Sequence, residues 1–137
     1  MKEKLLRFLC EIDKDFPIKL SEKTDLNLLA EKFCSLGEVG YIKTEDRIVA
    51  AVCGYMNDME TKEAYISVVG TLREYRGRGH AQELIEEFIE KSKISGMKSV
   101  KLHTRNSNFG AIRLYEKLGF VKVECDRVGD ICFRKEL

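Results

Sequence analysis

The feature of this sequence that most limits its fold is a change of hydrophobic period between residues 64 and 96. Residues 64–72 are rich in β-branched side chains, which is typical of a β-strand. Residues 81–89 instead place apolar side chains at i, i+3, i+4, i+7 and i+8, the spacing of an amphipathic helix. Between them lies the glycine-rich segment Arg76–Ala81. The chain therefore contains a strand that passes through a glycine-rich loop into a helix.

This loop has the properties of an anion-binding site. The first N–H groups of a helix have no partner within it, and the helix dipole places positive potential there. Gly77 and Gly79 let the backbone approach an anionic ligand without a Cβ atom in the way, and the small Ala81 extends that access. A Walker motif is absent, and Gln82 stands where a dinucleotide-binding motif has its third glycine. Taken alone, the loop is also compatible with a tight turn whose arginines are solvated.

The rest of the chain predicts two helices followed by a mixed sheet. We expect helices from about Lys2 to Asp13 and from about Asp25 to Leu36, the second capped by Thr24. Further strands are expected at residues 39–44, 47–55, 100–104, 120–125 and 131–134, and further helices at 79–96 and 111–118. The resulting order, α-α-β-β-β-α-β-α-β-β, predicts an α/β fold in which helices pack on a mixed sheet.

Composition and charge exclude several classes of protein. The 137 residues suit a single domain, and 44% hydrophobic with 34% charged residues supply a core without the signature of disorder. A formal net charge of +1 argues against binding to nucleic acid or to an anionic membrane. No stretch is apolar enough to span a membrane, and the N-terminus lacks the pattern of a signal peptide. We therefore expect a cytoplasmic protein.

The cysteines and histidines do not form a recognisable metal site. Five cysteines lie far apart, and they complete no metal-ligand spacing with His80 and His103. We expect reduced, mostly buried thiols and no bound metal.

A second polar segment follows the strand expected at residues 100–104. Asn106, Ser107 and Asn108 lie between this strand and the next helix, where Asn108 is placed to cap the helix or to bind a ligand amide. Tyr115 falls on the apolar stripe of that helix. It is therefore a candidate core aromatic, and its hydroxyl needs a partner if it is buried.

Together the two segments resemble the GNAT superfamily of acyl-CoA-dependent acetyltransferases. Arg76–Ala81 matches the signature R/Q-x-x-G-x-G/A, and Asn108–Phe120 matches the stretch N-x-x-A-x-x-x-Y-E-K-L-G-F. The resemblance covers roughly residues 38–135 and is locally close to the ribosomal-protein alanine acetyltransferases. It implies one GNAT domain over residues 1–137, with a mostly antiparallel, twisted sheet of about six strands and flanking helices. The family's first strand is short or absent here, around Ile18–Leu20.

The resemblance also implies roles for individual residues, with acetyl-CoA as cosubstrate. The loop would hold the coenzyme's pyrophosphate, and the preceding strand end would pair with its pantetheine arm. The implied coenzyme site comprises Val69, Gly70, Thr71, Arg76, Gly77, Arg78, Gly79, His80, Ala81, Asn108 and Tyr115. Tyr115 would also be the general acid that protonates the departing CoA thiolate. His80 stands where the family usually has an aliphatic residue, and we interpret it as a packing residue or a phosphate-facing donor.

The general base stays open at this point. An alkyl amine with a pKa near ~10 must lose a proton before it attacks a thioester. His103 stands where the ribosomal-protein enzymes carry a base glutamate, and an imidazole with a pKa of ~6.5 is suited to act as a base or as the partner of a relaying water. A lone histidine on a strand is, however, more often structural. Glu63, Tyr65 and a base that acts through water are the alternatives.

We expect an N-acetyltransferase whose acceptor is a small primary amine, such as an amino sugar or an amino acid derivative. This choice follows from the lack of a long basic or acidic segment for a peptide acceptor. A protein N-terminus or lysine is the alternative acceptor, and a non-catalytic acyl-CoA-binding domain is the alternative function. Exposed strand edges leave a homodimer open. The acceptor is least constrained, because the family builds that site largely from the N-terminal half, where this chain departs from the pattern.

Overall fold

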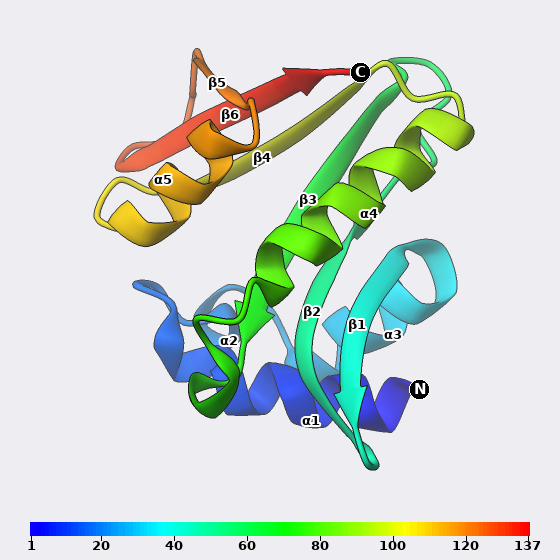
Figure 1. Ribbon diagram of the computed structural model, residues 1–137, viewed down its shortest axis with the longest axis vertical. Coiled ribbons are helices and arrows are strands. Elements are labelled where there is room, and N and C mark those ends of the chain that lie inside the picture. Colours follow the sequence, from blue (N-terminus) through cyan, green and yellow to red (C-terminus); the bar gives the residue numbers. More distant parts are fainter.

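The computed structural model describes residues 1–137 as a six-stranded sheet with helices on both faces (Figure 1). The strands are β1 (Glu38–Thr44), β2 (Arg47–Tyr55), β3 (Glu63–Thr71), β4 (Ser99–Arg105), β5 (Val121–Val123) and β6 (Asp130–Glu136). The helices are α1 (Lys2–Ile12), α2 (Leu20–Lys23), α3 (Leu26–Leu36), α4 (His80–Ile94) and α5 (Phe109–Lys117), with 3-10 turns at Asp13–Asp15 and Arg73–Tyr75. No helix combines the length and the apolar character that crossing a bilayer requires.

The sheet separates two hydrophobic cores. Helices α4 and α5 cover one face, where Leu84, Ile85 and Phe88 of α4 pack on the sheet. Helices α1 and α3 cover the other, where Phe8 and Phe33 are fully buried. Strand β2 contributes to both cores, because residues 48–53 are buried without interruption. The apolar run in the sequence predicted this double burial.

The sheet divides along its length into two parts. Its strand order is β1-β2-β3-β4-β6-β5, and only β3 and β4 run parallel. These two strands pair over just three residues, Glu63–Tyr65 against Ser99–Lys101. Beyond that point β3 stays paired with β2 as far as Thr71, and β4 stays paired with β6 as far as Arg105. The two halves diverge into a V that Figure 1 shows between β3 and β4.

The N-terminal helix packs closely on a glycine of β3 near the open end of this V. A Cβ atom on Gly70 would lie 2.5 Å from Cδ1 of Ile12, so a larger residue would force the Ile12 side chain to move. With glycine in that place, Ile12 packs on the end of β3. The segment after α1 is thereby brought to the divergence of β3 and β4.

The expected six-stranded mixed sheet is confirmed, and the element order differs in small ways. A further one-turn helix, α2, occupies the region in which the family's first strand was expected to be short or absent. Four residues carry too little periodicity to be recognised from sequence. The N-cap of α3 is Asp25 instead of Thr24, because the Asp25 carboxylate accepts hydrogen bonds from the N–H groups of Asn27 and Leu28, at 2.8 and 3.2 Å.

The expectation of reduced thiols is wrong for Cys125 and Cys132, and the expectation of mostly buried thiols is wrong for Cys10 and Cys34. Cys125 and Cys132 form a disulfide, with their Cα atoms 5.3 Å apart. Antiparallel pairing of β5 with β6 places Val123 opposite Cys132 and so brings the two cysteines together. Cysteine spacing alone does not reveal this pairing. Cys10 and Cys34 are free and exposed, and Cys53 is free and buried.

The disulfide closes a short loop and should contribute measurably to stability. For a separation of 7 residues, loop-closure entropy predicts that Cys125→Ser lowers the free energy of unfolding by about 2–3 kcal/mol. Chemical denaturation of the oxidised protein measures this, with Cys10→Ser as the control for loss of an exposed thiol. Equal stability of the two variants would show that the bridge does not constrain the unfolded chain.

Candidate active site

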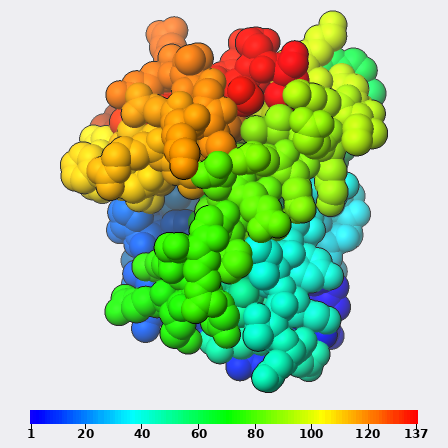
Figure 2. Space-filling view, in the orientation of Figure 1, coloured from blue at the N-terminus to red at the C-terminus, as the bar shows by residue number.

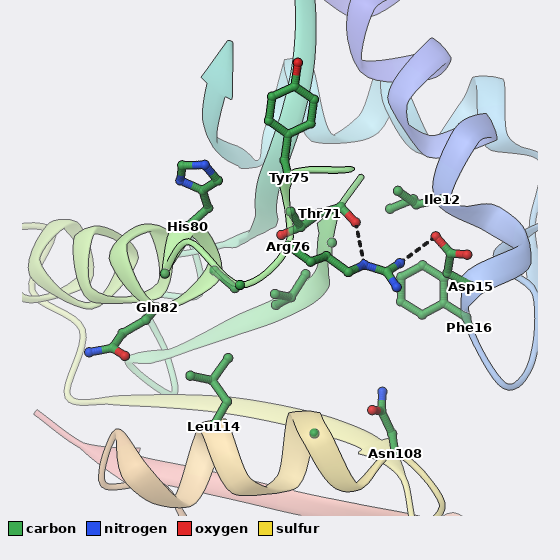
Figure 3. Close-up of a pocket in the computed structure, with 16 residues that line it drawn as sticks. Ile12, Asp15, Phe16, Thr71, Tyr75, Arg76, His80, Gln82, Asn108 and Leu114 are labelled. Carbon is green, nitrogen blue, oxygen red and sulfur yellow. Dashed lines mark hydrogen bonds and ion pairs between the residues drawn. The ribbon is translucent and has the colours of Figure 1, made fainter. Parts of the chain in front are cut away.

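A cleft of about 540 Å³ lies where β3 diverges from β4. Its walls are the end of β3, the glycine-rich loop, the first turn of α4, the start of α5 and the segment after α1 (Figure 3). In the space-filling view the surface is hollowed between this loop and α5, with N-terminal residues visible at the back (Figure 2). The cleft brings together most of the predicted coenzyme-site residues: Val69, Gly70, Thr71, Arg76, Gly77, Gly79, His80, Ala81 and Asn108.

Two predicted members of this set do not line the cleft. The Arg78 guanidinium lies 5.0 Å from the centre of the Tyr75 ring and donates to the carbonyl of Glu74 at 3.4 Å. Tyr115 belongs to a second cavity described below.

The glycine-rich loop presents bare backbone to the cleft. Gly77 and Gly79 both have φ of 79°, a left-handed conformation that favours glycine. Beyond the glycines themselves and their chain neighbours, no atom lies within 4 Å of where their Cβ atoms would stand. Helix α4 begins directly after Gly79 without a side-chain cap, so the N–H groups of its first turn have no partner within the helix. This arrangement fits an anionic group such as a pyrophosphate.

Arg76 connects the loop to the N-terminal segment. Its Nε–H donates to the carbonyl of Thr71 at 3.1 Å, and its Nη2 pairs with Oδ2 of Asp15 at 2.8 Å. Figure 3 shows this side chain extending from the loop to Asp15 beside Phe16. The sequence did not indicate Asp15 or Phe16, because nothing local marks a contact between residues 61 positions apart.

The edge of β3 that faces the cleft has unpaired backbone groups. Val69, Gly70 and Thr71 pair with β2 on one side, whereas the pairing with β4 ends at Tyr65. Apart from the Thr71 carbonyl, which accepts a hydrogen bond from Arg76, this edge can form strand-like hydrogen bonds with an extended ligand.

A second cavity, of about 150 Å³, adjoins the first. Both are lined by Phe16, Val69, Asn108 and Leu114. Asn108 also caps α5, since its side chain accepts a hydrogen bond from the N–H of Ala111 at 3.4 Å. The second cavity is further lined by Pro17, Ile18, Leu20, His103, Tyr115 and Asp130.

Tyr115 is buried beside this cavity. It is 7% exposed and packs edge-on against Phe120 and Phe133, with ring centres 6.0 and 5.8 Å away. Burial raises the pKa of Tyr115 above its ordinary value of 10.0. The hydroxyl therefore keeps its proton at neutral pH and is available to donate it.

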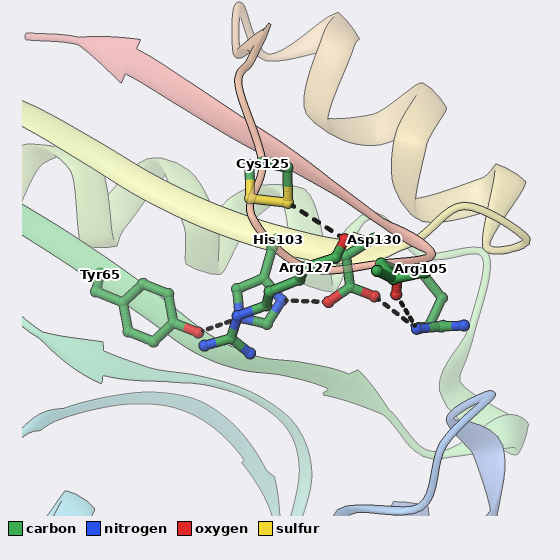
Figure 4. Close-up of a disulfide and its surroundings, with 8 residues drawn as sticks. Tyr65, His103, Arg105, Cys125, Arg127 and Asp130 are labelled. Atoms are coloured by element: carbon green, nitrogen blue, oxygen red, sulfur yellow. Dashed lines mark hydrogen bonds and ion pairs between the residues drawn. A yellow bond between two sulfur atoms is a disulfide. The ribbon is translucent and has the colours of Figure 1, made fainter.

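His103 lies in a row of polar side chains (Figure 4). Its Nε2 lies 2.6 Å from the Tyr65 hydroxyl, and its Nδ1 lies 3.2 Å from Oδ2 of Asp130. The other oxygen of Asp130 pairs with Arg105 at 3.1 Å. Burial, and secondly the charge of Arg127, lower the pKa of His103, while Asp130 opposes them. Burial raises the pKa of Tyr65. At neutral pH the His103 imidazole is therefore uncharged and carries a proton on only one of its two nitrogens.

Glu63, an alternative base, is occupied elsewhere. Its carboxylate pairs with Nε of Arg134 at 3.0 Å and accepts a hydrogen bond from Ser99 at 3.0 Å. It lines neither cavity.

Asp130 is a polar residue of the second cavity that sequence reasoning missed. It faces Arg105 in the pairing of β4 with β6. The register of that pairing is the signal that would have found it, and a sequence pattern without the register does not contain it.

Comparison with known proteins identifies relatives of this chain. Residues 6–120 match the acetyltransferase (GNAT) family. An N-alpha-acetyltransferase, MAK3, of Arabidopsis thaliana is 37% identical over 73 residues, which are 53% of this chain and 38% of that protein. An acetyltransferase of Pectobacterium atrosepticum is 30% identical over 125 residues, 91% of this chain and 78% of that protein. The chain thus spans less than half of the plant relative's length.

Solved structures share the fold. The PaiA N-acetyltransferase of Thermoplasma acidophilum, in complex with coenzyme A, has a TM-score of 0.82 at 16% identity, over 99% of this chain and 92% of that one. A ribosomal-protein-alanine N-acetyltransferase from Brucella melitensis has a TM-score of 0.76 at 16% identity, over 100% and 96%. The resemblance found in the sequence is confirmed.

The environment of His103 leads to a prediction about pH. We expect His103 to titrate below the 6.5 of a free imidazole, because burial and nearby cations disfavour the charged form. Its contribution to stability is then fully present above pH ~6.5 and is lost as the pH falls through the lower pKa of the folded state. NMR titration of the imidazole measures the pKa. A value at or above 6.5 would mean that Asp130 outweighs burial.

Proposed function

The chain belongs to the GNAT acetyltransferase family, and on this basis we propose that it is an N-acetyltransferase that transfers an acetyl group from acetyl-CoA to the α-amine of a peptide or protein N-terminus. The observation that carries this proposal is the pair of adjoining cavities at the divergence of β3 and β4. One cavity lies at an uncapped helix N-terminus, and the other contains His103 and Tyr115.

The first cavity is the proposed coenzyme site. Backbone N–H groups of residues 77–81 bind the pyrophosphate, and Arg78 contributes through its main chain. The free edge of Val69–Thr71 pairs with the pantetheine arm, and one of its N–H groups polarises the thioester carbonyl. Acetyl-CoA supplies a thioester that an amine can attack and a thiolate that leaves. Tyr115, which lines the second cavity and keeps its proton at neutral pH, donates that proton to the thiolate.

His103 and Tyr65 act together as the proposed base. Nε2 of His103 accepts the proton of the Tyr65 hydroxyl while that hydroxyl takes a proton from the acceptor amine through a bridging water, because Tyr65 itself lines neither cavity. One N–H bond of the amine, one O–H bond of the water and the tyrosine O–H bond break as two new O–H bonds and one new N–H bond form. The lowered pKa of His103 supports this role, since the imidazole is uncharged at neutral pH and one of its nitrogens can accept a proton.

The second cavity supports an N-terminal α-amine as the acceptor. A volume of about 150 Å³ admits an amine with one short side chain. Phe16, Pro17 and Ile18 supply an apolar wall for that side chain, and His103 also lines the cavity. Similarity to a protein named as an N-alpha-acetyltransferase adds further support. The small volume equally favours a small primary amine, which is the second candidate acceptor.

Two measurements test this function in sequence. Acetyl-CoA and CoA, but not ATP, should raise the melting temperature by several degrees, since a ligand at ~100 times its Kd stabilises the fold by about 2.7 kcal/mol. Mass spectrometry should then detect acetylation of peptides with a free α-amine and an apolar first residue.

The matched control is the same peptide with a blocked α-amine and a free lysine. Acetylation of amino sugars or amino acid derivatives in place of the peptides would assign the enzyme to small amines. Absence of a shift with either coenzyme would exclude the proposed coenzyme site.

The role of Tyr115 has its own test. Tyr115→Phe should lower turnover by ~10²–10⁴-fold, because the thiolate then leaves without a proton donor. The shift in melting temperature with CoA should persist, and Tyr41→Phe, on the exposed edge strand, should match wild type. Unchanged turnover in Tyr115→Phe would show that another group is the acid.

A further inference from the structure

We propose that Asp130 is a positioning residue for the reaction, which holds His103 in the tautomer and orientation that present Nε2 to Tyr65. The inference rests on the proposed N-acetyltransferase mechanism and extends it to a third residue. Asp130 acts through the imidazole, on the side away from Tyr65.

Hydrogen-bond chemistry determines which nitrogen carries the proton. Asp130 pairs with the Arg105 guanidinium at 3.1 Å, and a carboxylate in such a pair only accepts hydrogen bonds. The contact of 3.2 Å between Asp130 and Nδ1 of His103 therefore requires a proton on Nδ1. In the neutral ring, Nε2 then carries the lone pair. That lone pair accepts the hydroxyl of Tyr65 at 2.6 Å, so one tautomer satisfies every contact.

The three side chains come from three strands. Tyr65 lies on β3, His103 on β4 and Asp130 at the first position of β6 (Figure 4). Pairing of β4 with β6 sets Asp130 opposite Arg105, two residues from His103, so the two carboxylate oxygens contact different partners. The Asp130 side chain is 9% exposed and that of His103 is 12% exposed. A carboxylate this buried needs such partners to offset its lost hydration.

Asp130 also balances the charge around the imidazole. The groups that face His103 are Tyr65 of β3, Lys23 of α2, Arg127 of the β5–β6 connection and Asp130. Lys23 and Arg127 disfavour a protonated ring, and Asp130 is the anion that favours it. When Nε2 takes the proton passed on by Tyr65, Asp130 stabilises the resulting imidazolium through the Nδ1–H bond and itself stays ionised.

The first test compares Asp130→Asn with Asp126→Asn. Asp126 is exposed in the β5–β6 connection that leads to Asp130 and lies outside both cavities, so its variant controls for loss of a negative charge in this region. Asp130→Asn should lower kcat by ~10²-fold with an unchanged KM for acetyl-CoA, since the base is disordered and weakened. The acid limb of its kcat/KM profile should move to lower pH, because His103 loses the anion that raises its pKa. Asp130→Glu should recover part of the loss, and Asp126→Asn should match wild type.

A double-mutant cycle separates positioning from general support of the fold. In a His103→Ala background, Asp130→Asn should cause no further loss of kcat, because its effect acts through the imidazole. An equal loss in both backgrounds would overturn the proposal, as would a wild-type kcat and pH profile in Asp130→Asn.

A spectroscopic test needs neither acetyl transfer nor a folded variant. The ¹⁵N shifts of His103 in the wild-type protein report the tautomer directly, and a proton on Nδ1 is expected. A proton on Nε2 would overturn the proposal. If the wild type binds acetyl-CoA but acetylates no amine, the proposed function fails, while these shifts still decide the bond between Asp130 and His103.

Discussion

The parallel contact between β3 and β4 is the constraint on which the rest of the structure depends. It lasts for three residues, after which each strand follows its antiparallel partner, β2 or β6. Two strand edges thus part inside a continuous sheet, which a sheet tolerates only where something else satisfies the freed N–H and C=O groups. The cleft is lined by one of these edges and by the uncapped start of α4, so two of its walls offer backbone donors. A ligand with an anionic end and an amide-bearing arm matches both, and this is the chemistry of coenzyme A.

The same divergence explains the position of the polar row Tyr65–His103–Asp130. Tyr65 is the last residue of β3 to pair with β4, and His103 comes two positions after the last paired residue of β4. At this branch point the strands are still close enough for a hydrogen bond of 2.6 Å, yet the space beyond them is already open. Two side chains nearer the open end of the V would be too far apart to exchange a proton. Two side chains on the paired residues of β3 and β4 would have no open space beside them.

What the sequence predicted well depended on local pattern, and what it missed depended on register. The apolar run of β2, the change of hydrophobic period before α4 and the glycine-rich loop are each encoded by consecutive residues. The structure contains the strand, the helix and the loop that these patterns predict. The strand–loop–helix order and the family motifs also predicted that most of the proposed coenzyme-site residues would lie in one cavity. Arg76 meeting Asp15, Asp130 meeting His103, and Cys125 meeting Cys132 each join residues whose proximity is set by tertiary packing or strand pairing. No periodicity encodes such contacts, which is why the acceptor side was the least predictable part.

The ion pair between Arg76 and Asp15 has a consequence for how the two substrates influence each other. Arg76 belongs to the loop of the larger cavity, and Asp15 adjoins Phe16, which lines both cavities. A molecule that immobilises the loop therefore also restrains a wall of the neighbouring space. Any coupling that this contact carries is reciprocal, because linkage requires each ligand to change the affinity for the other by the same factor. The salt bridge thus joins the loop at the start of α4 to the N-terminal wall that the two cavities share.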